Sequence, residues 1–372
     1  MKSIPTLLCL FLFAVNSLGV WGEDLFIHRS GNRFYRGNDS TPYLYKGVSF
    51  QYAPLQSGLS RKEDRHRLCA QLDSLQSVGV TNLRILAGVR GSIPDSLQGD
   101  SLLRGMDYLL KEMHHRNQVA VICFPSPTDS AWLTSSSTIA DSLQICYQGW
   151  LERVVKHVNH HTRKAYGEDP TIMAWQLGEN LRPASPTGGD ALFARVRQTV
   201  QYLRTLDSHH MITVGSEGIR GSGNNVQLYR RLHSLSQVDY LTLQFRPIAW
   251  NWSSKSAVFT ALSRVYNKSS EYLAEHERIA FHLNKPLVIE SVTYPHDVGL
   301  AQSASGTRAR DAYFSFVFSW LTSNRPAETS LCGVRVGEWD ANLQPSVDDS
   351  VCDEVIRSTD SATLQTIRSV RW

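Results

Sequence analysis

Two carboxylates lie just after short apolar runs that have the length of buried strands. Glu179, followed by Asn180, comes after the run Ile172–Leu177, and Glu290 comes directly after the run Leu287–Ile289. Parallel α/β folds present functional side chains at the C-terminal ends of their strands, so both carboxylates can face one crevice. A pair of carboxylates across a crevice is the arrangement that hydrolyses glycosidic bonds.

These two runs belong to a series of eight that alternate with helical patterns. The predicted strands are Gly47–Tyr52, Asn82–Leu86, Gln118–Phe124, Ile172–Leu177, Met211–Gly215, Tyr240–Phe245, Pro286–Glu290 and Gly333–Gly337. The predicted helices are Lys62–Val78, Ser101–Arg116, Ser142–Tyr166, Asp190–Asp207, Val226–Ser236, Ser256–Leu283, Arg308–Thr322 and Asp353–Ser369. Eight strands that are each followed by a helix predict an α/β fold of the (β/α)8 TIM barrel type. A doubly wound sheet would have fewer units and usually a Gly-rich first turn, which is absent here.

The segment Leu25–Tyr45 precedes the first barrel strand and contains short strand-like pieces around Gly31 and Asn32. These pieces predict a hairpin that closes the bottom of the barrel. The chain has 372 residues, of which 42% are hydrophobic, so it can bury a large core. Because strand and helix patterns alternate throughout, we expect a single domain over residues 23–372.

Residues 1–22 have the composition of a secretory signal peptide. Lys2 precedes the apolar run Leu7–Val15, and small residues up to Gly22 offer cleavage sites. The apolar run is too short to span a bilayer. We therefore expect a secreted, extracellular protein that has no membrane association after cleavage.

Charge and spacing argue against several classes of ligand. The formal net charge is only +4, and no basic cluster alternates with aromatic residues, so nucleic acid is not an expected partner. The cysteines lack metal-ligand spacing with histidine, and the pairs His160-His161 and His209-His210 are expected to be solvated at helix ends. The sequence therefore predicts neither a metal site nor a cofactor.

Five cysteines remain after residue 22, and a secreted protein can form disulfides between them. Two pairings are compatible with the sequence, Cys123 with Cys146 and Cys332 with Cys352. An odd number leaves at least one cysteine unpaired. The spacing alone decides neither pairing.

The stretches that carry the two carboxylates resemble those of a known family. Residues 171–183, T-I-M-A-W-Q-L-G-E-N-L-R-P, and residues 285–297, K-P-L-V-I-E-S-V-T-Y-P-H-D, are similar to the fourth and seventh strands of the endo-β-1,4-mannanases of glycoside hydrolase family 5. The resemblance covers about residues 26–339. It implies a TIM barrel that hydrolyses β-mannan with retention, with Glu290 as the nucleophile and Arg84 as the residue that orients it. We expect a monomer that acts on β-mannan or a related polysaccharide.

The sequence departs from this family where the chemistry takes place. The family's Asn-Glu pair is Glu179-Asn180 here, so the resemblance places an amide at the acid/base position. Gln244 stands where the family has an active-site histidine, and Gly337 stands where it has the tryptophan under the sugar. Asn180 cannot exchange a proton, and loss of general acid/base help costs about 10²- to 10⁴-fold in rate. Glu179 can act as a substitute acid only if the backbone bends, because adjacent strand residues face opposite sides.

Several residues are candidates for contacts with the substrate. They are Arg84, Tyr52, Gln244, Trp250, Trp252 and Trp339. Each candidate also has a structural alternative. Glu290 and Arg84 can form a salt bridge, and Glu179 can pair with a neighbouring arginine. Tryptophans near a barrel mouth are often part of the core.

Three functions are compatible with this sequence. The first is a secreted β-mannanase-like hydrolase with an altered acid/base site and weakened turnover. The second is a catalytically inactive relative of the same fold that binds glycan or a protein partner. The third is a structural or interaction barrel with no glycan role, which a filled crevice would indicate. Release of reducing sugar from mannan separates the first from the second, and binding to mannan separates the second from the third.

Overall fold

The structure is a computed structural model that describes residues 26–57, 62–89, 92–125, 132, 138–297, 306–322, 329–339 and 354–371. All eight predicted barrel strands are present: β3 (Tyr45–Ser49), β4 (Val80–Leu86), β5 (Val119–Cys123), β6 (Ile172–Gln176), β7 (Met211–Thr213), β8 (Leu241–Phe245), β9 (Leu287–Val292) and β10 (Leu331–Glu338). They form one parallel sheet in the order β7-β6-β5-β4-β3-β10-β9-β8. The two end strands of this sheet meet, because the Asp239 N–H donates to the Ile212 carbonyl (2.8 Å) and Thr213 Oγ1 donates to the Tyr240 carbonyl (3.0 Å). The sheet is therefore a nearly closed barrel.

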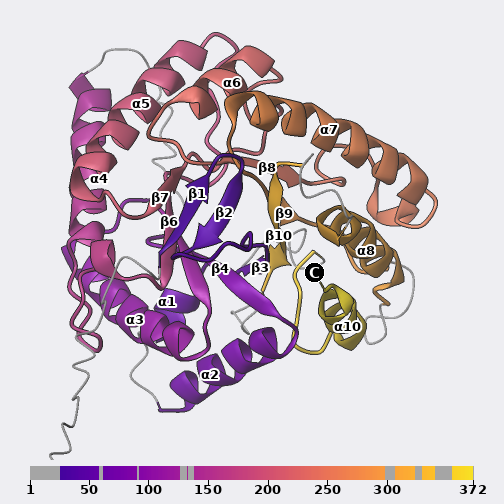
Figure 1. The fold of residues 1–372 in the computed structure, drawn as a ribbon, viewed down its shortest axis with the longest axis horizontal. Coiled ribbons are helices and arrows are strands. Elements are labelled where there is room, and N and C mark those ends of the chain that lie inside the picture. Colours follow the sequence, from indigo (N-terminus) through magenta and orange to yellow (C-terminus); the bar gives the residue numbers. More distant parts are fainter. Residues whose placement is uncertain are drawn as a thin grey trace, which may run out of the picture.

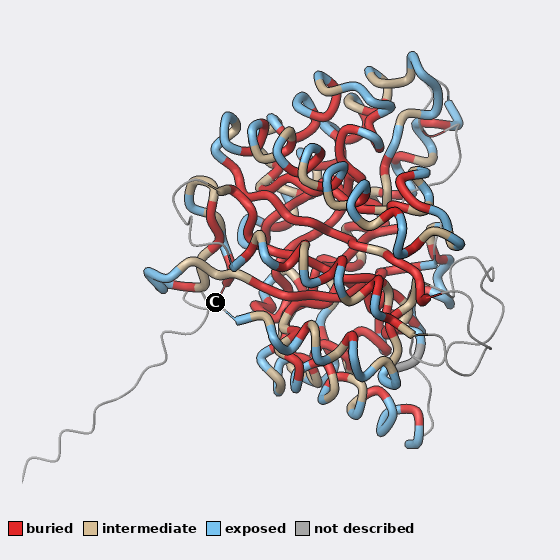
Figure 2. The backbone as a smooth tube through the Cα atoms, turned by 90° about the vertical axis from the view of Figure 1, so that its right-hand side faces the viewer, coloured by how far each residue is buried: buried red, intermediate tan, exposed pale blue. Residues whose placement is uncertain are grey.

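Helices form a ring around the strands (Figure 1). They are α1 (Ala53–Ser57), α2 (Lys62–Ser77), α3 (Ser96–His115), α4 (Thr138–Val155), α5 (Gly189–Leu206), α6 (Val226–Ser234), α7 (Leu262–Leu283), α8 (Arg308–Thr322) and α10 (Ser361–Ser369), with 3-10 turns at Tyr166–Glu168 and Lys255–Ala257. Buried residues follow the strands and the inner faces of the helices, and exposed residues lie on the outer faces (Figure 2). The predicted (β/α)8 TIM barrel is confirmed.

The N-terminal hairpin is also confirmed. Strands β1 (Ile27–Ser30) and β2 (Arg33–Arg36) pair antiparallel, and the hairpin lies across the middle of the helix ring in Figure 1. The Phe34 ring contacts the Tyr240 ring edge-on at 5.3 Å between centroids. Phe34 is fully buried and belongs to an apolar cluster with residues that the strands direct into the barrel, such as Val121. The hairpin therefore covers one end of the barrel interior.

Helix α4 is shorter than predicted, because the expected helix Ser142–Tyr166 ends at Val155. The side chain of Asn159 is the physical reason. This fully buried residue accepts at Oδ1 a hydrogen bond from the backbone N–H of His161 (2.8 Å), and Arg163 has the left-handed φ of 63°. A side chain that bonds to nearby backbone competes with the helix and favours a turn.

The last helix starts at Ser361 rather than at Asp353, and residue 353 lies outside the described part of the chain. Ile356 instead pairs with Trp339 in a parallel bridge beside β10. Among the described helices, none has the length and apolar content that a membrane span requires. The predicted signal peptide, residues 1–22, also lies outside the described residues.

Of the two pairings that the sequence left open, the disulfide between Cys123 and Cys146 is not formed. Cys123 is buried on β5 whereas Cys146 is exposed on α4, and both are free thiols. Cys332 is likewise free and buried, and its predicted partner, Cys352, lies outside the described residues. Residues on a strand that faces inward and on the outer side of a helix cannot approach to disulfide distance without backbone movement.

Candidate active site

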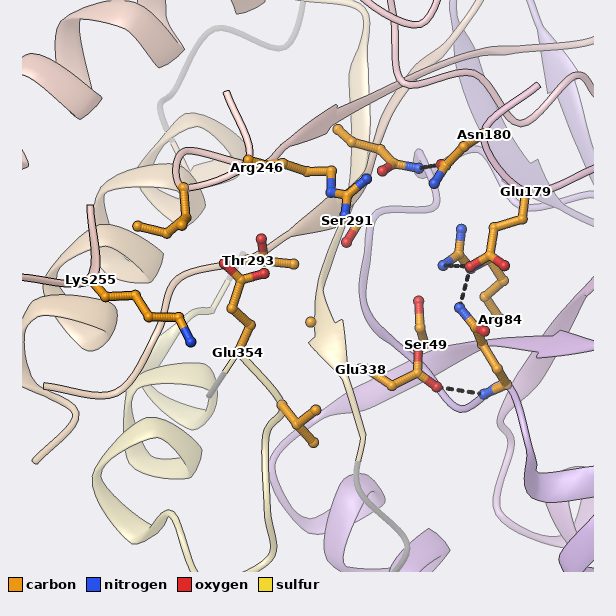
Figure 3. A pocket seen from close by; sticks show the side chains of 16 residues that line it. Ser49, Arg84, Glu179, Asn180, Arg246, Lys255, Ser291, Thr293, Glu338 and Glu354 are labelled. Atoms are coloured by element: carbon orange, nitrogen blue, oxygen red, sulfur yellow. Dashed lines mark hydrogen bonds and ion pairs between the residues drawn. The ribbon is translucent and has the colours of Figure 1, made fainter. Parts of the chain in front are cut away.

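A polar cavity of about 310 Å³ opens at the C-terminal ends of the barrel strands (Figure 3). Its lining consists of Ser49, Gln51, Arg84, Glu179, Asn180, Gln244, Arg246, Ile248, Ala249, Lys255, Ser291, Thr293, Gly337, Glu338, Glu354 and Val355. Most of these residues end a strand or follow one, which is where TIM barrels place their functional groups. Arg84, Glu179, Asn180 and Gln244 were predicted from the sequence, and the structure brings all four together.

Glu290 lies on β9 beside this cavity and is fully buried. Its Oε1 accepts hydrogen bonds from Arg84 on β4 and from Gln176 Nε2 on β6. Burial opposes the charge on Arg84, but the nearby carboxylates of Glu290 and Glu179 outweigh that effect and raise the pKa of Arg84. Three strands thus hold the carboxylate at the expected nucleophile position. Its other oxygen, Oε2, has no hydrogen-bond partner among the described residues.

Glu179 is directed into the cavity next to the same arginine. Arg84 Nη2 lies 3.5 Å from Glu179 Oε1, and Gln51 Nε2 donates to that oxygen at 2.5 Å. The backbone bends at this point, because Asn180 has a left-handed φ of 58°. One guanidinium therefore contacts both Glu179 and Glu290, as the sequence alternative of a salt bridge with Arg84 anticipated. Figure 3 shows the contact between Arg84 and Glu179.

The bend after β6 depends on a close approach to the chain after β7. Gly215 has a φ of 79°, and a Cβ atom at this position would lie 2.0 Å from the Gly178 carbonyl oxygen. Only glycine fits there, since any side chain would overlap with the backbone of the turn. This contact lets residues 179 and 180 both reach the cavity instead of alternating between opposite faces.

Asn180 and Gln244 form a pair of amides in the cavity wall, and Asn180 lies next to Glu179 (Figure 3). Gln244 Nε2 donates to Asn180 Oδ1 at 2.5 Å. These are the two positions at which the sequence departs from the expected glutamate and histidine. Neither amide can give up or take up a proton near neutral pH, so the pair can bind hydroxyl groups but cannot act as an acid or base.

Glu217 holds the loops behind this amide pair. It is almost fully buried and accepts from Arg182 Nη2 at 2.8 Å and from Arg246 Nη1 at 2.9 Å. Glu217 does not line the cavity, whereas Arg246 does. The double ion pair fixes the loop after β6 to the end of β8, and it thereby positions Asn180 and Gln244 relative to each other.

The predicted aromatic contacts with the sugar lie away from the cavity. Trp250 and Trp252 pack on each other at 4.9 Å between ring centroids and on Tyr272, and Trp339 is fully buried. Tyr52 does not line the cavity either. Among the described lining residues there is no aromatic ring.

The surroundings of Gly337 show what occupies the place where the family has a tryptophan under the sugar. Gly337 has a φ of 44°, and a Cβ atom there would lie 3.1 Å from Ile356 Cδ1. Glu354 and Val355, which precede Ile356, line this side of the cavity. The C-terminal segment therefore occupies the space next to Gly337. Sequence reasoning missed Glu354, because nothing in its local pattern signals a contact with a strand end.

Gln176, Glu338 and Ser49 were also not predicted as site residues. Gln176 lies inside the stretch that carries the family resemblance, so its closeness in sequence to Glu179 could have identified it as a site residue. Glu338 Oε1 accepts from the Gln51 backbone N–H at 3.1 Å and adds a further carboxylate to the cavity wall. Ser49 ends β3 in a run that gives no sign of function.

A family profile described as "GH family 5 beta-mannosidase-like" matches residues 24–135 and 134–350. The chain therefore belongs to the β-mannosidase-like proteins of glycoside hydrolase family 5, a family of glycosidases. Among curated proteins it is similar to mannan endo-1,4-beta-mannosidase 3 of Oryza sativa subsp. japonica, with 27% identity over 221 residues that cover 51% of this chain and 46% of the relative. The chain thus spans about half the length of the first curated relatives it matches.

The barrel is also similar to solved structures. A family 5 mannosidase from Rhizomucor miehei superimposes with a TM-score of 0.77 at 19% identity, over 94% of this chain and 97% of that one. A mutant of the Rhizomucor miehei mannosidase in complex with mannosyl-fructose gives the same TM-score at 20% identity, over 94% and 97% of the two chains. At this level of identity the likeness establishes the fold.

Proposed function

We propose that this protein is a secreted, β-mannanase-like glycoside hydrolase that binds β-mannan or a related polysaccharide and hydrolyses it slowly, with retention of configuration. The observation that carries the proposal is the contrast across the cavity. The nucleophile position keeps a positioned carboxylate, Glu290, whereas the acid/base position holds Asn180 bonded to Gln244. The names of the curated relatives and the mannosyl-fructose complex of a similar barrel support a mannose-containing ligand.

The proposed chemistry begins with attack by Glu290 on the anomeric carbon, which breaks the bond to the leaving oxygen and forms a glycosyl ester. In an intact retaining enzyme a second carboxylic acid protonates that oxygen and later deprotonates the water that hydrolyses the ester. Asn180 can do neither. Glu179 is the adjacent residue in the chain and carries a carboxylate, but its Oε1 already accepts from Gln51 and contacts Arg84. Both steps are therefore slow on an unactivated linkage.

Unpaired polar groups around the cavity support a hydroxyl-rich ligand. Ser49 and Thr293 line the cavity, and their buried hydroxyl oxygens have no hydrogen-bond partner among the described residues. Leaving such groups unpaired costs about 1–3 kcal/mol each, and sugar hydroxyls can satisfy them. We also propose that residues 1–22 are removed on secretion and that residues 23–372 act as a single-domain monomer without membrane contact.

A second candidate function is glycan binding without turnover. The full burial of Glu290 favours it, because Glu290 does not line the cavity whereas Arg84 does. A carboxylate that serves only as the ion-pair partner of Arg84 would be placed in the same way. The two candidates differ in whether Glu290 can reach an anomeric carbon.

The two candidates are distinguished with an aryl β-mannoside whose dinitrophenolate leaving group departs without a proton. If Glu290 is a nucleophile, the glycosyl ester forms and accumulates, because no base activates water for its breakdown. Intact mass spectrometry should then show one added hexose in the wild type and none in Glu290→Gln. An unmodified wild type that still binds mannooligosaccharide in calorimetry would make glycan binding without turnover the function.

A further inference from the structure

Asp107, His157 and His160 form a cluster in the helical layer, between α3 and the turn that follows α4. Their potential metal-ligating atoms lie within 4.8 Å of one another. His157 Nε2 is 2.9 Å from Asp107 Oδ1, and His160 Nδ1 is 3.2 Å from Asp107 Oδ2. None of the three residues lines the cavity. We propose that this cluster binds one divalent transition metal ion of the zinc type, independently of any action on glycans.

The carboxylate of the cluster is already fixed in place. The Asp107 side chain is only 1% exposed, and the Tyr166 hydroxyl donates to its Oδ1 at 2.7 Å. The backbone N–H of His160 donates to the other oxygen at 3.2 Å. Metal ligands are usually oriented by hydrogen bonds of this kind from a surrounding shell of residues. The protein therefore bears the cost of orienting the buried ligand before any ion arrives.

The turn that carries the histidines is built by Asn159. This fully buried residue bonds in both directions, since its Nδ2 donates to the Asp107 carbonyl at 3.1 Å and its Oδ1 accepts from the His161 N–H at 2.8 Å. It ends α4 early and directs His157 and His160 to the same side. The two imidazole rings lie nearly parallel, with 6.1 Å between their centroids and 23° between their planes.

The distances fit a small tetrahedral ion. Zinc bonds of about 2.0–2.2 Å to nitrogen and oxygen require ligand atoms that are about 3.3 Å apart. His157 Nε2 and His160 Nδ1 each lie at about this distance from one oxygen of Asp107, although the two oxygens differ, and all three ligand atoms lie within 4.8 Å of one another. Small side-chain movements therefore suffice to bring them around one ion. The His160 side chain is 71% exposed, which leaves room for water at the fourth position. Two imidazoles and one carboxylate are a donor set that zinc accepts.

Binding displaces the hydrogen that lies between His157 and Asp107. At present His157 Nε2 and Asp107 Oδ1 share a hydrogen bond, so one of the two atoms carries the hydrogen. A metal ion needs the Nε2 lone pair, so His157 binds as the tautomer with its hydrogen on Nδ1, and any surplus proton passes to solvent. The ion then lies between the imidazole and the carboxylate, where the proton lay before.

Titration calorimetry of the full chain with zinc chloride, after removal of metal with a chelator, tests the proposal. We expect one saturable site per chain and a rise in the unfolding temperature with zinc, because an ion that binds only the folded state stabilises it. His160→Gln should weaken zinc binding at least tenfold, since even the loss of a supporting residue costs about 10- to 100-fold. His160 is exposed, so this variant should fold like the wild type.

His161→Gln is the matched control, because His161 is the exposed neighbour of His160 and lies outside the cluster. Its affinity for zinc should equal that of the wild type. Cobalt chloride gives a second readout, because cobalt bound in a tetrahedral site with nitrogen ligands absorbs visible light. The wild type and His161→Gln should show this absorbance, and His157→Gln should not. Three results would overturn the proposal. They are equal zinc affinity in the wild type and His160→Gln, an equal loss of zinc affinity in His160→Gln and His161→Gln, and no saturable binding at millimolar zinc.

Discussion

Arg84 with Glu290 and Asn180 with Gln244 are two hydrogen-bonded pairs at the same barrel mouth, but they differ in kind. The first pair joins a full positive charge to a full negative charge in a site where Arg84 is 4% exposed and Glu290 is not exposed at all. The second pair joins two neutral amides in the cavity wall. We call Arg84 with Glu290 the charged half of the site and Asn180 with Gln244 the amide half. The charged half can hold a nucleophile in one orientation, and the amide half can hold a sugar hydroxyl.

The difference teaches which part of the chemistry this cavity can support. Attack on an anomeric carbon needs a positioned carboxylate, whereas departure of an alkoxide needs a proton, and the two requirements fall on different residue pairs of the site. Arg84 contacts Glu179 as well as Glu290, so the carboxylate next to Asn180 in the sequence belongs to the charged half. The amide half has no group that titrates near neutral pH.

The largest effect should come from moving a carboxylate into the amide half. The double substitution Glu179→Asn with Asn180→Glu should raise hydrolysis of mannan by up to about 10²- to 10⁴-fold, which is the usual contribution of a general acid and base. The left-handed φ of 58° at residue 180 should keep the gain towards the lower end, because a glutamate there is strained by about 1–2 kcal/mol. Reducing-sugar release measures the rate.

Glu179→Asn alone is the control for this exchange, since it leaves no carboxylate at either position. Its rate should not exceed that of the wild type. The comparison between the halves breaks down if the wild type already hydrolyses mannan at an ordinary rate and Glu179→Asn abolishes it. Glu179 would then be the acid, and the amide pair would serve only to bind.

The sequence predicted the barrel well because each strand is a short apolar run between helical patterns, and that signal is local. It also placed Glu290, Arg84 and Asn180 at one mouth, since strand ends in a parallel barrel share a face. It could not predict that Gln51 bonds to Glu179, because 128 positions separate them. The sequence predicts helix at Glu354, but the contact of this segment with the cavity depends on packing between Ile356 and Gly337. Helix α4 was extended too far because the turn depends on one side chain, Asn159.

A second prediction concerns the stability that the charged half needs. Arg84→Met should lower the free energy of unfolding by about 3–5 kcal/mol, since it leaves the buried carboxylate of Glu290 without its cation. Arg153→Met is the matched control, because Arg153 forms a 2.5 Å ion pair with Asp100 at the surface. Exposed pairs contribute about 0–1 kcal/mol. Urea unfolding measures both variants.

Adding Glu290→Gln to Arg84→Met sharpens this prediction. Because a neutral amide is cheaper to bury than an unpaired carboxylate, the double variant should recover part of the lost stability. If Arg84→Met costs no more than Arg153→Met, the ion pair does not hold Glu290 in place. The description of this half as a charge-stabilised unit would then be wrong.

The smallest effect concerns the support behind the amide half, where His276 of α7 fixes the loop that carries Glu217. His276 Nε2 accepts from the Ile219 N–H at 2.9 Å, and its Nδ1 donates to the Tyr272 carbonyl at 2.6 Å, so the ring must be neutral. Burial lowers the pKa of His276 to about 4, although the hydrogen bond to Tyr272 acts in the opposite direction. Burial likewise lowers the pKa of nearby His233, to about 3.

A histidine in an unfolded chain has a pKa of about 6.5, so below this pH the unfolded chain takes up a proton that folded His276 refuses. The stability that neutral His276 contributes is therefore complete above pH 6.5 and is lost as the pH falls towards 4. At pH 5 the loss should be about 2 kcal/mol, at 1.36 kcal/mol per pKa unit. Urea unfolding at pH 7.5 and pH 5 should show a loss of stability in the wild type that exceeds the loss in His276→Gln by about 2 kcal/mol. His282→Gln replaces an exposed histidine on the same helix and should keep the wild-type difference. If His276→Gln also keeps the wild-type difference, acid does not destabilise the support behind the amide half through His276.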